Sequence, residues 1–278
     1  MNRLPIPSIS IIVPSYNHRP WISSCINSIL IQKTKRDQLI VVDGKSNDGT
    51  KEVLEQYAKE IDHLIIEPDN GQADALHKGF SLATGDILAY LNSDDILLPQ
   101  TFSFVRELFQ NNMGVDAVYS NRVFIDQDSN PIAKWVIPFH SDYCHKRWDY
   151  IPQETCFWRK SLMDKAGYID TTLQFAMDYD LFIRMMNAGN FKHVHRYLAC
   201  FRDHPNTKTN TIYETTGKDE ICSIKRKYNI ETFTFDRLIG NIYGQLTIRL
   251  GQLLNFADRL TKYKQLTKEI AIASKCKK

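Results

Sequence analysis

The sequence predicts an α/β fold in which a mostly parallel, Rossmann-like sheet carries helices on both faces. In the first hundred residues, short apolar runs alternate with helical segments, a pattern typical of right-handed βαβ units. The fourth apolar run, Ile87–Leu91, leads directly into two adjacent carboxylates, as expected of a buried parallel strand that delivers acids to the carboxyl edge of a sheet. With 278 residues, 43% of them hydrophobic, the chain can bury a core without disulfides or a structural metal.

The elements of the first half follow from local patterns. Short runs rich in Ile, Val and Leu predict strands at Ile9–Val13, Leu39–Val42, His63–Glu67 and Ile87–Leu91. Apolar residues near a spacing of 3.6 predict helices at Trp21–Leu30, Thr50–Lys59 and Gln72–Leu82. Pro99 predicts the start of a further helix, because proline is favoured at the first helical position.

The second half has a mixed pattern. Antiparallel strands are expected at Ala117–Ser120, Val123–Ile125 and Ile132–Val136, with a turn over residues 128–131. The aromatic stretch Asp142–Gln153 is expected to be irregular. A helix is expected at Asp178–Ala188, ended by Gly189, and an extended segment at Phe191–Phe201.

A basic amphipathic helical tail is predicted over residues 231–278. From Asp236 to the end there are nine Lys and Arg against three Asp and Glu, and Leu238, Ile242 and Leu246 recur at helical spacing. Three interpretations stay open. The tail could pack on the parent domain, form a contact between copies of the chain, or adsorb to an anionic membrane surface.

Composition and cysteine spacing exclude several classes of protein. The formal net charge of +3 is too small to indicate nucleic-acid binding. The six cysteines contain no Cys-x-x-Cys pair, which predicts reduced buried thiols and no zinc site. Because there is no apolar leader and no apolar stretch of the ~20 residues that a spanning helix needs, we expect a cytoplasmic protein, with peripheral attachment to the inner face of the membrane as an alternative.

The acids after the fourth strand are the first candidate site. Asp94 and Asp95 would repel each other and lose hydration unless a positive group neutralises them. A divalent cation that carries a phosphate is the simplest such group. Since the loops after parallel strands meet at one edge of the sheet, other polar residues of these loops should join this site.

Residues after the earlier strands fit the binding of a nucleotide. Asp43 could accept a hydrogen bond from a nucleobase imide or a ribose hydroxyl. Tyr16 could stack on a base, with a packing residue the alternative. The helix that starts at Gln72 favours an anion at its N-terminus. Asp74 and Lys78 add polar groups there, with Lys78 as a solvated surface charge the alternative.

Taken together, these segments resemble a known enzyme family. Val13–Asn17, Asp43–Thr50 and Leu91–Asp95, in this order and spacing, resemble glycosyltransferase family 2, and the resemblance runs from about Ser8 to Asn210. It implies the GT-A fold for residues 1–230, with a nucleotide-binding half over about 8–112 and an acceptor half over about 113–210. It also implies inverting transfer from a nucleotide sugar.

The resemblance implies roles for single residues of the nucleotide-binding half. The Asp-x-Asp motif of the family corresponds to Asn92-Ser93-Asp94, so Asp94 would bind Mn²⁺ or Mg²⁺, while Asn92 replaces an acid. Asn92, Ser93 and Pro14 would contact the nucleotide, and Asp95 would orient the loop or the donor sugar. Many relatives have Arg-Asn where this chain has Leu76-His77, so a phosphate-side arginine is missing unless Lys78 replaces it.

In the acceptor half, the resemblance points to Asp178 as the general base, with Met177 in place of the glutamate that precedes it in the family. The alternative is a first-turn charge on a helix, where Asp180 and Arg184 are also spaced for an ion pair. Trp158 could offer an apolar face to a sugar or could be a core aromatic. The late Arg-x-His segment places Arg202 near the diphosphate and His204 near the metal, with a structural histidine the alternative.

We therefore expect a hexosyl- or N-acetylhexosaminyltransferase of polysaccharide biosynthesis. It would move a sugar from a donor, expected to be UDP- or dTDP-linked, to a hydroxyl of a glycan or lipid-linked glycan. One rival is a catalytically silent glycan- or nucleotide-sugar-binding subunit, since Asn92 and Met177 replace acids. A sugar nucleotidyltransferase is the other rival, but it would need a glycine-rich loop after the first strand, and residues 14–20 contain no glycine.

Overall fold

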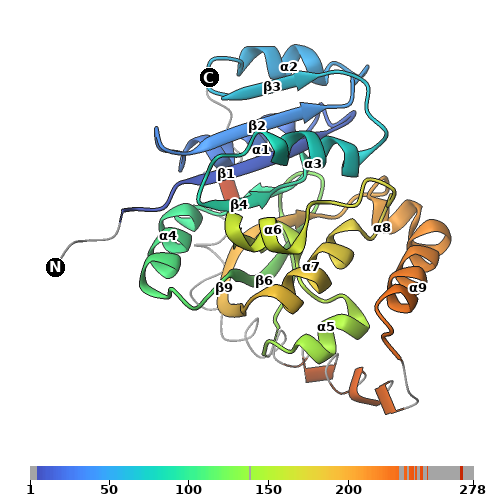
Figure 1. Ribbon diagram of the computed structural model, residues 1–278. Coiled ribbons are helices and arrows are strands. Elements are labelled where there is room, and N and C mark those ends of the chain that lie inside the picture. The colour runs from blue at the N-terminus through green and yellow to red at the C-terminus, as the bar shows by residue number, and fades with distance from the viewer. Residues whose placement is uncertain are drawn as a thin grey trace.

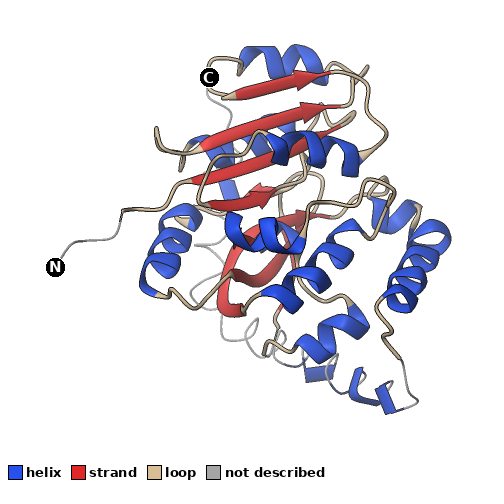
Figure 2. Ribbon diagram, viewed as in Figure 1, coloured by secondary structure: helices blue, strands red, loops and turns tan. Residues whose placement is uncertain are grey.

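A single mixed sheet runs through the molecule and has helices on both of its faces (Figures 1 and 2). The computed structural model describes residues 5–137, 139–231, 235–236, 238–240, 242, 245–246, 249 and 270–271. In this part of the chain the sheet has nine strands in the order β3-β2-β1-β4-β8-β6-β9-β5, and β7 pairs with β6 at the side.

The first half of the sheet is parallel, as the sequence predicts. Its strands are β1 (Ile9–Ser15), β2 (Gln38–Asp43), β3 (His63–Ile66) and β4 (Ile87–Tyr90). The helices between and after them are α1 (Ile22–Leu30), α2 (Thr50–Gln56), α3 (Gln72–Ser81) and α4 (Thr101–Asn111). The expectation that Pro99 begins a helix is wrong, because Gln100 adopts a left-handed conformation with φ 66° and α4 starts after it.

The second half of the sheet is mixed. Its strands are β5 (Ile96–Leu97), β6 (Ala117–Ile125), β7 (Pro131–Trp135), β8 (Phe157–Arg159) and β9 (Phe191–Arg202). The central strand β6 is antiparallel to β7 and β8 and parallel to β9. The two strands expected between Ala117 and Ile125 are therefore one strand. It continues through Asn121, where its register with β9 shifts, and the amide oxygen of Asn121 accepts the Ile137 N–H at 3.0 Å and lies 2.9 Å from His193 Nε2.

The remaining helices lie in the second half of the chain. They are α5 (Asp142–Trp148), α6 (Lys160–Ala166), α7 (Met177–Ala188), α8 (Lys208–Thr211) and α9 (Lys218–Lys227). A 3₁₀ turn spans Gln153–Thr155 and a π-type turn spans Tyr213–Gly217. The expectation that residues 142–153 are irregular is wrong for α5, where Ser141 Oγ caps the first turn by accepting the Cys144 N–H at 3.2 Å.

Residues that alternate along the central strands fill two cores, one on each face of the sheet. On one face Ile12 and Tyr90 pack with α3, α6 and α7, and on the other face Ile11 and Val13 pack with α1 and α4. Helix α3 lies very close to β1, because a Cβ added at Gly79 would lie 2.4 Å from Ile12 Cγ2. This close packing fixes the N-terminus of α3 beside the carboxyl edge of the sheet.

Most of the predicted tail lies outside the described residues. Among those described, Asp236 is buried against α5, where it accepts a hydrogen bond from Arg147 Nε at 3.2 Å. Phe235, Leu238, Ile242 and Leu246 are exposed. Within the described part of the chain, none of the helices combines the length and the apolarity that crossing a bilayer requires.

Candidate active site

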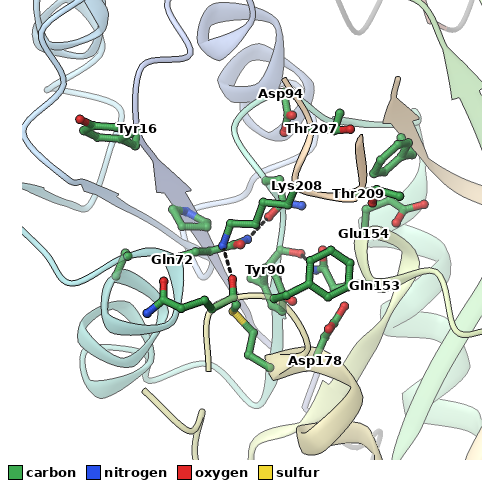
Figure 3. A pocket seen from close by; sticks show the side chains of 18 of the residues that line it. Tyr16, Gln72, Tyr90, Asp94, Gln153, Glu154, Asp178, Thr207, Lys208 and Thr209 are labelled. Carbon is green, nitrogen blue, oxygen red and sulfur yellow. Dashed lines mark hydrogen bonds between the residues drawn. The ribbon is translucent and has the colours of Figure 1, made fainter. Parts of the chain in front are cut away.

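A cavity of about 820 Å³ lies at the carboxyl edge of β1, β2 and β4, between the two halves of the chain. This is where open α/β sheets bind ligands. The nucleotide-binding half contributes Pro14, Tyr16, Gln72, Asn92 and Asp94 to its lining. The acceptor half contributes Asp149. It also contributes Glu154, Asp178 and Lys208, which are labelled in Figure 3. Predicted residues from segments far apart in the sequence thus meet in one cavity.

The loops after β1 and β2 are joined at the nucleotide end of the cavity. The Gly44 N–H donates to the Ser15 carbonyl at 2.9 Å. Asp43 is fully buried, and its two oxygens accept the backbone N–H and the hydroxyl of Ser46 at 2.8 and 2.7 Å. Tyr16 is 58% exposed and lines the cavity. Asp43 therefore holds the loop, while Tyr16 presents an open aromatic face.

Helix α3 brings one of its three predicted residues into the cavity. Gln72, its first residue, donates from Nε2 to Asn92 Oδ1 at 2.6 Å. Lys78 instead contacts Glu67 Oε1 at 2.9 Å and Asp74 Oδ2 at 3.5 Å on the outside of the helix. Neither Lys78 nor Asp74 lines the cavity.

Asp94 belongs to a cluster with two histidines, of which His204 is buried and His18 is partly buried. Its Oδ2 lies 3.0 Å from His204 Nε2, and candidate ligand atoms of Asp94, His204 and His18 all lie within 4.8 Å of one another. His18 Nδ1 in turn lies 2.7 Å from the hydroxyl of Ser93. Burial works against ionisation of Asp94, but the hydrogen bond with His204 and the field of His18 outweigh it, and the pKa of Asp94 is lowered.

Asp95 and Arg202 support this cluster from behind. Asp95 Oδ1 accepts the Arg202 backbone N–H at 2.8 Å, and burial together with the charge of Asp94 raises the pKa of Asp95 well above its usual value. The Arg202 guanidinium donates to the carbonyls of Asp94 at 2.7 Å and Asp126 at 2.8 Å. Arg202 is fully buried and ties the turn after β6 to the Asp94 loop, so it does not line the cavity.

Asp178 faces the cavity from the start of α7. It is partly exposed, and its Oδ1 accepts the Tyr179 backbone N–H at 2.9 Å. The ion pair expected between its neighbour Asp180 and Arg184 forms, with Asp180 Oδ2 2.8 Å from Arg184 Nε. Burial raises the pKa of Asp178, so its carboxylate is more basic than an ordinary aspartate.

With this geometry in view, similarity to known proteins decides the family. A family model described as "Glycosyl transferase family 2" matches residues 10–167, more than half of the chain. The chain belongs to glycosyltransferase family 2. It is therefore an enzyme of the transferase class, as the resemblance implied. An uncharacterized glycosyltransferase of Nostoc sp. is 27% identical over 270 residues, which cover 92% of this chain and 83% of the relative.

Solved structures with the same architecture confirm the GT-A-like fold of this family 2 glycosyltransferase. TarS 1–349 of S. aureus in complex with UDP-GlcNAc has a TM-score of 0.66 at 16% identity, covering 96% of this chain and 82% of TarS. In another TarS 1–349 structure the match covers only 65% of the TarS chain. A mannosyltransferase of Pyrobaculum calidifontis in complex with GDP-Man and Mn²⁺ has a TM-score of 0.58 at 16% identity, covering 96% and 85% of the two chains.

Trp158, the aromatic residue expected to face a sugar in the family 2 enzyme, lies in the core and does not line the cavity. Trp158 is fully buried, and its ring packs 5.8 Å from Phe80 and 6.2 Å from Phe182, measured between ring centroids. The core interpretation of Trp158 therefore fits this structure. No apolar face of Trp158 is open to a sugar.

Other cavity residues had no motif that could reveal them. Arg122 makes a two-pronged ion pair with Glu154, with both nitrogen–oxygen distances 2.7 Å. Asp149 lines the cavity near Asp178, and burial and the charge of Asp178 raise its pKa well above the usual value. Lys208 donates from Nζ to the Gln174 carbonyl at 2.7 Å, and burial lowers its pKa to about 8. Only the closeness of Lys208 to the Arg-x-His segment gave a signal in the sequence.

Proposed function

We propose that this glycosyltransferase moves one sugar from a nucleotide-diphosphate donor to a hydroxyl of a glycan or lipid-linked glycan, with inversion, in polysaccharide biosynthesis. The observation that supports this most strongly is the single cavity that Asp94 and Asp178 enter from opposite halves of the chain. The neighbours in complex with UDP-GlcNAc and GDP-Man support a nucleotide sugar as donor. A UDP- or dTDP-linked sugar stays our proposal for this chain.

The nucleotide would bind across the ends of β1, β2 and β4. Tyr16 would stack on the base, an interaction worth ~1–3 kcal/mol. Asp43 would keep the loop after β2 in position for the nucleotide. The lone pairs that Ser46 leaves free on its carboxylate would accept a hydrogen bond from the nucleotide. Pro14, Gln72 and Asn92 line the path of the nucleotide, and Ser93 would act through its contact with His18.

Asp94, His204 and His18 would hold the metal ion. A carboxylate and two imidazoles within 4.8 Å of one another are a donor set that suits a divalent transition metal, whereas Mg²⁺ prefers a shell of oxygens. We therefore propose Mn²⁺ ahead of Mg²⁺. Bound there, the metal would supply Lewis-acid stabilisation of the departing diphosphate.

Asp178 would accept the proton of the acceptor hydroxyl as that oxygen attacks the anomeric carbon. Its position in the cavity and its raised pKa suit a general base, because basicity rises with pKa while the group stays ionised near neutral pH. A single displacement with one base inverts the configuration of the anomeric carbon. Asp95 and Arg202 would hold the Asp94 loop in place.

Incubation with UDP-, dTDP- and GDP-sugars in the presence of Mn²⁺ tests the proposal. We expect one donor to release its nucleoside diphosphate, slowly to water and faster with a glycan acceptor, and the product to have the inverted anomeric configuration by NMR. Retained configuration would contradict the role of Asp178. Binding of a nucleotide sugar without any release would instead support a silent subunit, the rival suggested by Asn92 and Met177.

A further inference from the structure

The cavity has a shortage of available positive charge. Five acidic side chains line it, those of Asp69, Asp94, Asp149, Glu154 and Asp178, and of these Glu154 is paired with Arg122. Among the described lining residues, the Lys and Arg side chains are those of Arg122 and Lys208. The donor of the proposed reaction would add a diphosphate to this acidic surrounding. A single divalent ion at Asp94 would leave part of that negative charge without a partner.

Arg122 is already engaged. Both prongs of its guanidinium bind Glu154, and it lies 4.7 Å from the ring centroid of Phe201 and 5.4 Å from that of Trp135. A buried pair of this geometry is costly to break. Lys78, the replacement that the sequence suggested for the missing arginine, is held by Glu67 and Asp74 outside the cavity.

Lys208 has a neutral partner and a favourable position. Its Nζ donates to the backbone carbonyl of Gln174, and its side chain extends into the cavity toward Gln72 (Figure 3). Its helix is fixed to the candidate metal ligand His204, because the Thr207 N–H and Asn210 Nδ2 both donate to the His204 carbonyl, at 3.1 and 2.9 Å. The backbone that carries Lys208 is thus tied to His204, and the Lys208 side chain lines the same cavity as Asp94.

We propose that Lys208 binds the diphosphate of the nucleotide-sugar donor, exchanging its hydrogen bond with the Gln174 carbonyl for one with a phosphate oxygen. This inference rests on the proposed function. A lysine suits the role because its ammonium is a compact point charge on a flexible stem. The charges of Asp178, Glu220 and Asp69 favour its protonated form, and the added phosphate would favour it further.

Calorimetric titration with Mn²⁺ present tests the assignment. The ligands are UDP, dTDP and GDP, each compared with its nucleoside. We expect Lys208→Met to weaken binding of the diphosphate by roughly ten- to a hundredfold, the range for a lost charge-assisted hydrogen bond, and to leave nucleoside binding unchanged. Lys208→Arg keeps the charge and should stay within about threefold of the wild type.

Lys218→Met is the matched control, because Lys218 pairs with Glu214 on an exposed face and does not line the cavity. It should bind like the wild type, and melting temperatures without ligand check that each variant is folded. Unchanged diphosphate binding by Lys208→Met, or an equal loss for nucleoside and diphosphate, overturns the role of Lys208 alone. A wild-type chain that binds no nucleoside diphosphate overturns the proposed function, and this inference with it.

Discussion

His204 Nε2 lies 3.0 Å from Asp94 Oδ2, although 110 positions separate the two residues in the chain. The contact joins the loop after β4 to the segment that follows β9, and so connects the nucleotide-binding half to the acceptor half. A proton or a cation between these atoms would favour the contact, whereas an unpaired Asp94 carboxylate would be costly at this depth. We infer that the contact that joins the two halves is also part of the proposed metal site.

Loss of either residue should therefore weaken the binding of Mn²⁺. We expect Asp94→Asn and His204→Ala each to lower the affinity for Mn²⁺ in the presence of UDP at least tenfold, which electron paramagnetic resonance of the free ion can measure. His77→Ala, on an exposed position of α3, is the matched control. Wild-type affinity in the His204→Ala variant would show that His204 has only a structural role.

Replacement of the proposed base should separate chemistry from binding. Asp178→Asn keeps the shape of the side chain but cannot take a proton, so we expect kcat to fall by about 10²–10⁴-fold. The KM for the donor and the melting temperature should change little, because the Asp178 side chain accepts a hydrogen bond from the backbone of its own neighbour Tyr179, which the asparagine oxygen can also accept. Asp164→Asn, in an exposed pair with Lys160, is a control that should retain full activity. Turnover near the wild-type rate in Asp178→Asn would rule out general-base catalysis by this residue.

The pH dependence of kcat should report the surroundings of Asp178. Burial raises its pKa, while the hydrogen bond from the Tyr179 backbone N–H and the charges of Arg122 and Lys208 act in the opposite direction. A base works only when it is ionised, so activity should fall as the pH is lowered through this raised pKa. The inflection is expected clearly above the ordinary aspartate value of about 3.9. A rate that stays constant down to about pH 4 would contradict this assignment.

A second buried aspartate should control stability instead of activity. The Asp37 carboxylate accepts the backbone N–H groups of Ile9 and Thr34 at 2.9 and 2.7 Å and pairs with Arg106, so it joins β1 to α4. We expect Asp37→Ala to lower the free energy of unfolding by about 3 kcal/mol, because it leaves a buried cation and two amides without their partner. Urea denaturation measures this loss.

The direction in which this stabilisation changes with pH follows from the lowered pKa of Asp37. Burial opposes its ionisation, but the hydrogen bonds with Arg106, Thr34 and Ile9 outweigh burial, and the folded-state pKa lies below the unfolded one. The stabilisation is therefore complete above the unfolded pKa and disappears as the pH falls through the folded pKa. The difference in unfolding free energy between wild type and Asp37→Ala should shrink in acid. A difference that stays constant would contradict the pairing.

The parallel half of the fold was predictable because its signals are local. Strands β1 to β4 are short apolar runs between turn residues, and the helices between them have a clear 3.6-residue period. The mixed half depends on distant partners. Two strands were expected, ending at Ser120 and resuming at Val123, yet β6 is continuous and the Asn121 side chain between them contacts Ile137 and His193. Helix α5 begins at a Ser141 cap, but its aromatic and basic residues hid the helical period.

The sequence predicted those site residues that belong to a motif at the end of a strand or the start of a helix. Asp94 and Asp178 reach the cavity because their motifs end a strand and begin a helix at its rim. The direction of a side chain depends on packing, so Trp158 lies in the core and Lys78 on the surface. Lys208 enters the cavity without any motif of its own, because its position depends on contacts made only in the folded chain.

The most direct test of the central claim is anomalous diffraction from a crystal grown with Mn²⁺ and UDP. We expect the manganese peak beside the Asp94 carboxylate, with both phosphates next to it and Tyr16 against the base. A manganese ion bound elsewhere, with Asp94 in contact only with His204 and other protein atoms, would contradict the proposed enzyme mechanism.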